Sequence, residues 1–233
     1  MTTPFLLEVI ACSVDDAVAA AKGGAGRLEV ISHFEVGGLT PELVTVRRIV
    51  SSVTIPVRVM LRASPNSTRG AAAESASLLA IAREFAALPI DGFVLGFLSN
   101  GDLDEEYIAE LLGCAPHLRA TFHRAFEEVV SETRAVAALK RFSQFDRILT
   151  SGGGGDWSTR IARLASLEIA TGPEIQVLAG GGLDPSALAR IQRTTGIREF
   201  HVGRAARRPE TIEGIVDAER VSGLVRMLNA SGE

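Results

Sequence analysis

Short apolar segments of strand length alternate with longer segments of helical periodicity along the whole chain. Alternating polar and apolar positions are typical of strands, and apolar residues spaced three or four positions apart are typical of helices. The pattern predicts strands over residues 6–10, 27–31, 56–61, 92–97, 118–122, 147–149, 175–179 and 199–202. It predicts helices over residues 14–23, 41–51, 71–87, 104–113, 132–142, 158–171, 185–194 and 217–229.

Residues that favour the start of a helix precede three of these segments. Ser13, with Asp16 three positions later, fits a capping box, in which two side chains satisfy the first free N–H groups of a helix. Thr40 and Asp184 each stand directly before a proline, which fits an N-cap followed by proline at the first helical position. We therefore expect helices to begin directly after Ser13, Thr40 and Asp184.

The order of the elements predicts the fold class. Strands that alternate with helices pair in parallel through right-handed crossovers. Eight strand–helix units without a linker fit one α/β domain over residues 1–233, a single (β/α)8 TIM-type barrel. An open doubly wound sheet is the alternative. It usually has fewer strands at this length, and no G-x-G-x-x-G motif follows the first predicted strand.

Polar side chains occupy alternate positions of several predicted strands. In a barrel, alternate strand residues point inward, and catalytic residues lie where the strands end. The residues predicted to point inward are Glu8, Ile10, Glu29, Ile31, Arg58, Met60, Arg62, Thr121, His123, Glu199 and His201. Because a buried carboxylate without a cation is costly, we expect the two glutamates of the first strands to pair with Arg58 and Arg62. Such a group fits either a structural ion network or a catalytic pocket.

Two histidines stand at the ends of predicted strands. His123 follows the fifth strand in LRATFHRAF, and His201 lies in the eighth strand in REFHVGRAAR. A histidine with its ordinary pKa near 6.5 can act as an acid or a base, although a lone histidine is more often a hydrogen-bonded core residue. His33 and His117 are expected to face solvent.

Glycine-rich segments follow the sixth, seventh and eighth predicted strands. The loops after the last two strands of TIM-type barrels often hold a phosphate, because backbone N–H groups approach the anion closely there. The candidate anion-binding residues are Ser151, Gly152, Gly180, Gly181, Gly182, Gly203 and Arg204. The alternative is that these glycines only allow the chain to turn out of a strand.

Composition narrows the class of partner. The net charge is −4 and aromatic residues make up 5% of the chain. We therefore expect no nucleic acid and no membrane surface as partner, since both require a basic face. The remaining candidate partner is a small anionic molecule. The two cysteines, Cys12 and Cys114, form no C-x-x-C pair. The sequence shows neither the pattern of a signal peptide nor a run of about 18 successive apolar residues. We therefore expect a cytoplasmic location.

Seven stretches, in this order along the chain, resemble the CutC family of copper-homeostasis proteins: LEVIACSVDDA, RLEVISHFEVGGLTP, TIPVRVMLR, TFHRAFE, RILTSG, AGGGL and EFHVGRA. The resemblance implies a TIM-type barrel in the cytoplasm, self-association into a homo-oligomer, and copper ion binding, as Cu(I), in copper tolerance. Within these stretches, Glu8, Glu29, Arg62, His123 and His201 match the family pattern in place.

The chain departs from the family where the resemblance would place metal ligands. The cysteines of the first two strands are Ile10 and Ile31 here. Because Cu(I) prefers thiolate and thioether ligands, we predict no metal ligands, and copper remains a cofactor only by resemblance. Cys12, with Met60, is the alternative source of soft ligands. The loop after the third strand also differs, since RASPNS keeps only Arg62 of the family pattern.

These observations leave two hypotheses for function. The first is a copper-homeostasis protein with a polar acid–base pocket where the barrel strands end. The second is an enzyme of the isomerase or lyase type that acts on a small anionic or phosphorylated substrate without a metal. In the second, Glu8 or Glu29 is the base, His123 the acid and Arg62 the group that binds the anion, since one acid–base pair can move a proton beside a carbonyl.

Overall fold

Eight parallel strands close into a barrel in the computed structural model, which describes residues 5–230. The barrel strands are β1 (Leu6–Ala11), β2 (Arg27–Val30), β3 (Val57–Met60), β4 (Gly92–Leu95), β7 (Arg119–Phe122), β8 (Phe145–Thr150), β9 (Gln176–Ala179) and β10 (Glu199–Val202). They follow chain order around the barrel, and β1 pairs with both β2 and β10. The predicted (β/α)8 barrel is therefore confirmed, and the open sheet is wrong.

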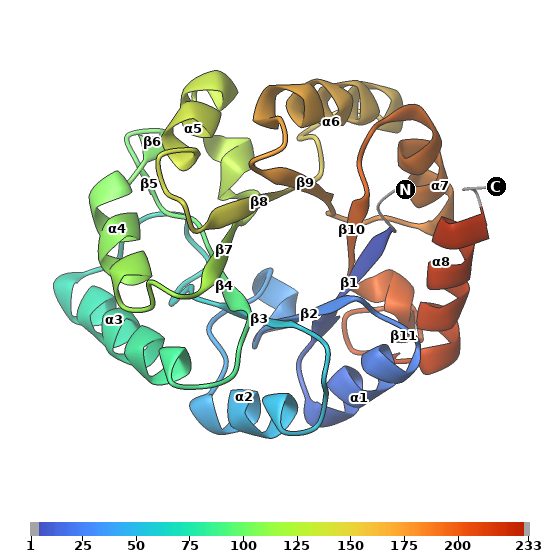
Figure 1. The fold of residues 1–233 in the computed structure, drawn as a ribbon, viewed down its shortest axis with the longest axis horizontal. Helices are drawn as coiled ribbons and strands as arrows, with labels where there is room; N and C mark the ends of the chain where they lie inside the picture. The colour runs from blue at the N-terminus through green and yellow to red at the C-terminus, as the bar shows by residue number, and fades with distance from the viewer. Residues whose placement is uncertain (1–4, 231–233) are drawn as a thin grey trace.

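The helices form a ring around the strands, as Figure 1 shows. They are α1 (Val14–Lys22), α2 (Leu43–Val50), α3 (Ala72–Ala86), α4 (Glu105–Gly113), α5 (Glu132–Leu139), α6 (Trp157–Thr171), α7 (Pro185–Thr194) and α8 (Ala218–Ala230). None of the helices within residues 5–230 is long and apolar enough to cross a membrane. Residues 1–4 and 231–233 of the predicted domain lie outside the described residues.

An apolar layer fills the space between the strands and the helices. Outward-facing strand residues such as Val9, Val59 and Phe93 are fully buried. They belong to one cluster with helix residues such as Ile49 and Phe85. Amphipathic helices cover the outer face of the strands, so the polar strand residues are left to the inner face, which is the interior of the barrel.

The predicted helix starts at Ser13 and Asp184 are confirmed. The Ser13 hydroxyl accepts a hydrogen bond from the Asp16 N–H group at 3.1 Å. The Asp184 carboxylate accepts one from the Ala187 N–H group at 2.7 Å. The Asp16 carboxylate instead accepts from the Cys12 N–H group at 3.0 Å, so only the serine half of the predicted capping box forms.

The predicted helix start at Thr40 is wrong. Helix α2 begins at Leu43, with Glu42 as its N-cap. The Thr40 hydroxyl accepts a hydrogen bond from the Arg62 N–H group at 2.8 Å and donates one to the Arg62 carbonyl at 3.1 Å. Because the neighbouring loop engages this hydroxyl, the start of the helix moves to Leu43.

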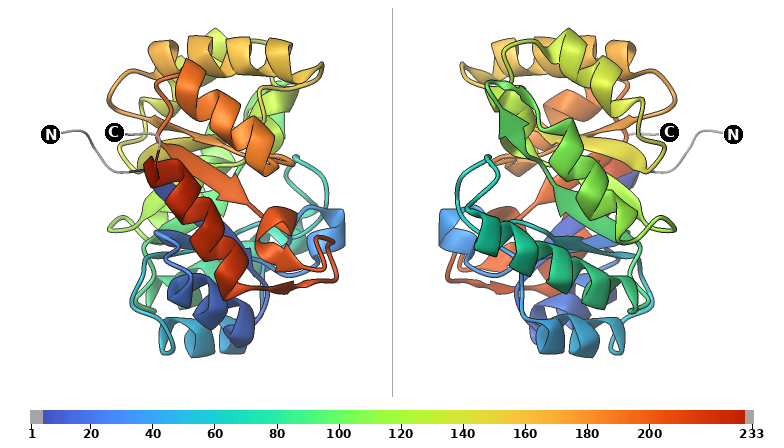
Figure 2. Two further views of the ribbon diagram at one scale, coloured as in Figure 1. Left: turned by 90° about the vertical axis from the view of Figure 1, so that its right-hand side faces the viewer. Right: turned by 90° about the vertical axis from the view of Figure 1, so that its left-hand side faces the viewer.

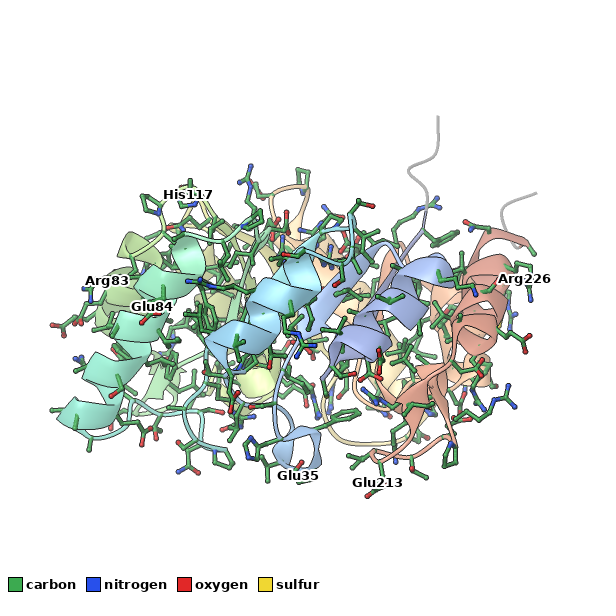
Figure 3. All side chains as sticks on the ribbon, turned by 90° about the horizontal axis from the view of Figure 1, so that it is seen from below. Glu35, Arg83, Glu84, His117, Glu213 and Arg226 are labelled. Carbon is green, nitrogen blue, oxygen red and sulfur yellow. The ribbon has the colours of Figure 1, made fainter. Side chains whose placement is uncertain are left out.

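The loops that follow the strands build up one end of the barrel, which we call the barrel mouth. They contain the 3-10 helices η1 (Phe34–Val36), η2 (Arg124–Glu128) and η3 (Arg204–Ala206) and the hairpins β5 (Leu98–Ser99)–β6 (Asp102–Leu103) and β11 (Arg207–Arg208)–β12 (Ile215–Val216). Figure 2 shows η1 beside the segment from η3 to β12. In Figure 3, Glu35 and Glu213 lie at the mouth and His117 lies at the opposite end.

Candidate functional site

Ion pairs fill the part of the barrel interior that is farther from the mouth. Arg27 contacts the Glu8 carboxylate and lies 2.8 Å from the Glu199 carboxylate. Arg147 bonds the same Glu199 carboxylate at 2.5 and 2.7 Å and also contacts Asp146. The register of the strands explains the contact between Glu8 and Arg27. Glu8 of β1 lies opposite Arg27 of β2 and opposite His201 of β10.

Arg58 belongs to this network but does not pair with the glutamates for which it was predicted. Its guanidinium bonds Asp146 at 2.6 and 2.8 Å, Asp91 at 2.8 Å and the Thr121 hydroxyl at 2.7 Å. The expected pairing of Arg58 with the glutamates of β1 and β2 is therefore wrong. The stagger of neighbouring strands brings Arg58 toward β4, β7 and β8 instead.

Arg27 and Arg147 were not predicted as interior residues, although the strand alternation contains the signal for both. Arg27 is two positions before Glu29, and Arg147 is two positions before Leu149, so each shares the inward parity of its strand. Arg27 is fully buried and Arg147 largely so. A basic residue at the start of a predicted strand was a cue that could have identified both.

A carboxyl–imidazole–carboxyl group connects the ion network to the mouth. His201 Nδ1 lies 2.8 Å from Glu8 Oε1, and His201 Nε2 lies 3.6 Å from Glu29 Oε2. Burial lowers the pKa of His201, but the two carboxyls outweigh it and raise the pKa above its ordinary value. His201 thus lies between two buried carboxyl groups that favour its protonated form.

The two glutamates have opposite electrostatic environments. Burial raises the pKa of Glu8, but Arg27 and His201 outweigh burial and hold that pKa below its usual range. Burial dominates at Glu29 and raises its pKa to about 7. Glu29 Oε1 is buried and has no hydrogen-bond partner among the described residues. Of the two predicted bases, the geometry therefore favours Glu29.

His123 presents a fixed N–H donor. The Ala125 N–H group donates to His123 Nδ1 at 3.1 Å, so the neutral ring carries its hydrogen on Nε2. Burial, followed by the charge of Arg62, lowers the pKa of His123 to about 3. Nε2 is buried and has no partner in the described part of the chain. Gly96 makes room for the ring, because a Cβ there would lie 2.6 Å from Nδ1.

Arg62 is half-buried where two mouth loops meet. Its terminal nitrogens contact the backbone carbonyls of Pro65 and, at 3.5 Å, Gly38. Its Nε atom is buried and, among the residues that the structure describes, has no partner. The expected pairing of Arg62 with a glutamate is wrong, because its guanidinium holds loop carbonyls instead. Arg62 therefore keeps one N–H donor free for a ligand.

These groups line a cavity of about 1020 Å³ at the mouth. Four of the five predicted catalytic residues border it, and Glu8 lies beneath it in contact with His201. Apolar side chains also line it, among them Ile10, Phe34, Met60 and Leu149, together with further charged groups such as Arg124, Glu127 and Glu128. The cavity thus combines buried hydrogen-bonding groups with an apolar surface, which is the usual character of a small-molecule site.

The glycine segments after β9 and β10 also border the cavity. Gly181, Gly182, Gly203 and Arg204 line it. Gly181 and Gly182 have φ values of 77° and 84°, a conformation that favours glycine. These four predicted anion-binding residues therefore face the same space as Glu29, and they provide backbone groups beside a cation.

The other three predicted anion-binding residues have bonded N–H groups. The Ser151 N–H group donates to the Glu127 carboxylate at 2.7 Å. The Gly152 N–H group donates to the Thr150 hydroxyl at 3.1 Å, and the Gly180 N–H group donates to the Thr150 carbonyl at 2.9 Å. In this conformation, Ser151, Gly152 and Gly180 offer no free N–H group to a ligand.

The positions that the resemblance assigns to cysteine ligands form an apolar cluster. Ile10 and Ile31 are buried together with Met60 and Val94, and Cys12 packs against them. Burial raises the pKa of Cys12 to about 11, despite the nearby Arg207 guanidinium. Cu(I) is bound by deprotonated thiols, and no group of three or more His, Cys, Asp or Glu residues within 5–230 is arranged to hold a metal. The donors present do not fit a Cu(I)–thiolate site.

Comparison with known proteins identifies the family. The family model for the CutC family matches residues 5–206. A family protein CutC from Mesorhizobium japonicum is 34% identical over 208 residues, which are 89% of this chain and 80% of that protein. The mouse copper homeostasis protein cutC homolog is 35% identical over 198 residues, 84% of this chain and 72% of its own. A crystal structure of CutC from Streptococcus agalactiae has a TM-score of 0.78 at 26% identity and covers 85% of this chain and 98% of its own. The chain belongs to the CutC family.

Proposed function

We propose that this chain serves in copper homeostasis and that its working site is the cavity at the barrel mouth. The mouse and human relatives carry copper homeostasis in their names. The observation that carries the assignment is that two residues bordering the cavity, Glu29 and His123, each have a buried atom, Oε1 and Nε2, without a hydrogen-bond partner among the described residues. A fold keeps such groups at a cost in stability, which is typical of a functional site.

We further propose that the chain does this without a Cu(I)–thiolate site. The support is the apolar packing at Ile10 and Ile31 and the raised pKa of Cys12. The copper-related role then rests on the acid–base group Glu29 and the N–H donor His123, with Arg62 as the cation of the site. This is the part of the family pattern that the chain keeps.

A second candidate function is an enzyme of the isomerase or lyase type that acts on a small anionic substrate. The specific observation in its favour is that Glu29 and His123 at the mouth are suited to two different steps of a proton transfer. Glu29, with its raised pKa, can take a proton near neutral pH. His123 is a neutral N–H donor that can stabilise a developing negative charge on a carbonyl oxygen.

The location and assembly of the chain are also proposals. A cytoplasmic location is supported by the free state of Cys12 and Cys114, because disulfides are typical of oxidising compartments. Self-association is implied by the family resemblance. Light scattering on the purified chain measures the assembly state, and a mass equal to one chain would contradict self-association.

Copper tolerance of cells tests the main proposal. A bacterial strain that lacks its own CutC-family protein is grown in copper with the wild-type chain, Cys12→Ser or Glu29→Ala. We expect the wild type and Cys12→Ser to restore growth equally and Glu29→Ala to fail. Restored growth with Glu29→Ala but not with Cys12→Ser would contradict the proposed site. If the wild type does not restore growth, the proposed role in copper homeostasis is wrong.

Anion binding tests the candidate enzyme pocket. Phosphate at millimolar concentration should raise the Tm of the wild type by mass action. Arg62→Ala and Arg204→Ala should reduce this shift, while Arg83→Ala, an exposed arginine on α3, should not. A Tm that phosphate leaves unchanged in the wild type would contradict the anion pocket.

A further inference from the structure

We infer that the mouth cavity binds a small molecule in which an oxyanion stands next to a hydroxyl group. Arg62 and His123 donate to the oxyanion, and Glu29 bonds the hydroxyl. This inference rests on the proposed use of the cavity and names the class of ligand. It follows from which buried groups lack partners, from their donor or acceptor character, and from the charge balance of the interior.

Buried atoms without hydrogen-bond partners are concentrated at residues that border this cavity. Five buried side-chain N or O atoms in the described part of the chain have no hydrogen-bond partner. Three of them, Glu29 Oε1, Arg62 Nε and His123 Nε2, belong to residues that border the mouth cavity. Because native folds bond nearly all buried polar atoms, three exceptions around one space indicate a ligand that completes their hydrogen bonds.

Two of the three atoms are donors. Arg62 Nε always carries a hydrogen, and His123 Nε2 carries one because the ring's other nitrogen accepts from the Ala125 N–H group. The two side chains are close enough for the charge of Arg62 to disfavour protonation of His123. Two N–H donors and a positive charge on residues that border one cavity suit an oxyanion, such as a carboxylate or a phosphate.

Among the described residues of the ion network, Glu29 has the weakest contact with a cation. The closely paired groups are four carboxylates and four basic side chains: Glu8, Asp91, Asp146 and Glu199 with Arg27, Arg58, Arg147 and His201. Glu29 shares His201 with Glu8, which lies closer to it. A buried carboxyl that only shares a more distant cation is best accommodated as a neutral acid. It then offers both a donor and an acceptor, and a ligand hydroxyl matches these.

The lining of the cavity suits a ligand with both polar and apolar parts. Apolar surface comes from Ile10, Phe34, Met60 and Leu149. Charged and polar side chains make up much of the remaining border, among them Ser67, Arg124, Glu127, Glu128, Asp184 and Glu210. A small molecule with one oxyanion and one neighbouring hydroxyl matches the donor and acceptor character of the three atoms that lack partners among the described residues.

Glycolate and acetate form the matched pair of probes, since they differ only by the hydroxyl next to the carboxylate. Binding to the full chain is measured by NMR titration at pH 6, where Glu29 holds its proton. We expect glycolate to bind the wild type about tenfold more tightly than acetate, which is the fold-change of one good hydrogen bond. Glu29→Ala should bind glycolate no better than acetate and should keep its affinity for acetate. Glu29→Leu serves the same purpose if the alanine variant does not fold.

Substitutions of His123 test the donor directly. His123→Gln places an amide N–H near the position of Nε2 and should keep the affinity for both anions. The side chain of His123→Asn is too short to reach that position, so this variant should lose about tenfold in affinity for both anions. His117→Asn, at an exposed histidine of the opposite end of the barrel, is the matched control and should change neither affinity.

The possible outcomes separate this inference from the proposed function. If acetate and glycolate bind equally to the wild type, or if Glu29→Ala keeps the preference for glycolate, the ligand class is wrong while the anion pocket stands. If neither anion binds and phosphate leaves the Tm unchanged, both the inference and the anion pocket fail. If His123→Asn binds as the wild type does, His123 is not the donor and the oxyanion position is wrong.

Discussion

At the scale of single residues, Glu8 and Glu29 show how one kind of side chain takes two roles. Both are buried on neighbouring strands. Glu8 uses both carboxylate oxygens, one on Arg27 and one on His201. Within residues 5–230, Glu29 has one oxygen without a partner, and its other oxygen makes only a 3.6 Å contact with His201. The first is held ionised as part of the ion network, and the second is left able to exchange a proton.

Strand alternation identified the interior position of these residues but not their partners. Parity along a strand decides which face a side chain occupies. Which residue it meets across the barrel depends on the stagger between strands, and the sequence pattern does not carry that information. This explains why Glu8, Glu29 and His201 were found, while their expected pairing with Arg58 and Arg62 was wrong.

The first prediction concerns stability when Glu29 is replaced by glutamine. Because the native pKa of Glu29 is raised to about 7, the folded state keeps a proton that the unfolded state releases above its ordinary carboxyl pKa. Wild-type stability therefore falls as pH rises through this window. Glu29→Gln cannot ionise, so it should match the wild type at pH 4 and exceed it by on the order of 3 kcal/mol at pH 8. Urea unfolding at both pH values measures this. Strong destabilisation at pH 8 would show that Glu29 is only a structural ion-pair partner.

The second prediction concerns Glu8→Gln, for which the pH dependence of stability has the opposite sign. The native pKa of Glu8 is lowered, so its contribution to stability is present above the ordinary carboxyl pKa and is lost as pH falls toward the native value. Its replacement leaves the Arg27 and His201 cations without this carboxylate. We expect a loss of about 3 kcal/mol at pH 7 that shrinks in acid. An unchanged urea midpoint at pH 7 would contradict the assignment.

At the scale of elements, local signals predicted the helices and strands to within a few residues, and tertiary contacts caused the exceptions. Ser13 and Asp184 cap helices as expected, because their partners lie within the same segment. Thr40 does not, because the backbone of Arg62 in the next loop engages its hydroxyl. The β11–β12 hairpin was also missed, since a strand of two residues has no hydrophobic period to detect.

A buried aspartate holds that hairpin against the start of α1. The Asp16 carboxylate accepts hydrogen bonds from the Arg207 guanidinium and from the Val216 N–H group, each at 3.0 Å. The hairpin continues from η3, which carries Arg204 at the edge of the cavity. The position of one side of the mouth therefore depends on a contact made from α1.

The third prediction tests this contact with Asp16→Asn. The amide keeps the shape but loses the charge, so the buried Arg207 guanidinium loses its carboxylate and stability should fall by about 3 kcal/mol. Hydrogen exchange of residues 207–216 should accelerate more than that of the barrel strands. Asp15→Asn, at the exposed neighbouring position, is the control. It should change neither the stability nor the hydrogen exchange of residues 207–216. Equal exchange in both variants would contradict the role of Asp16.

At the scale of the whole molecule, the barrel brings together residues that are almost the full chain apart. Glu8 and His201 are adjacent because β1 pairs with β10. The count of strand–helix units predicted this closure, and closure in turn placed the strand-end residues around one mouth. Where the family resemblance would suggest thiols, the chain has Ile10 and Ile31, which are buried in one apolar cluster, and only Ile10 of the two borders the cavity.

The fourth prediction concerns copper itself. Because Cys12 is held as a thiol and its neighbours at positions 10 and 31 are apolar, the purified chain should bind Cu(I) only weakly. A competition titration with a Cu(I) chelator measures this, and Cys12→Ser and Cys114→Ser should give the same curve as the wild type. Tight one-to-one binding that disappears in Cys12→Ser would overturn the prediction and place Cys12 in a metal site.

If the barrel mouth is an anion-binding pocket, a crystal of the chain grown with sulfate at pH 6 should hold the anion there. Sulfate is divalent at this pH, so its binding reports on the protein groups alone. We expect a sulfate whose oxygens lie within hydrogen-bond distance of Arg62 Nε and His123 Nε2, which have no partner among the described residues. A mouth without sulfate, in which both nitrogens bond only protein groups, would contradict it.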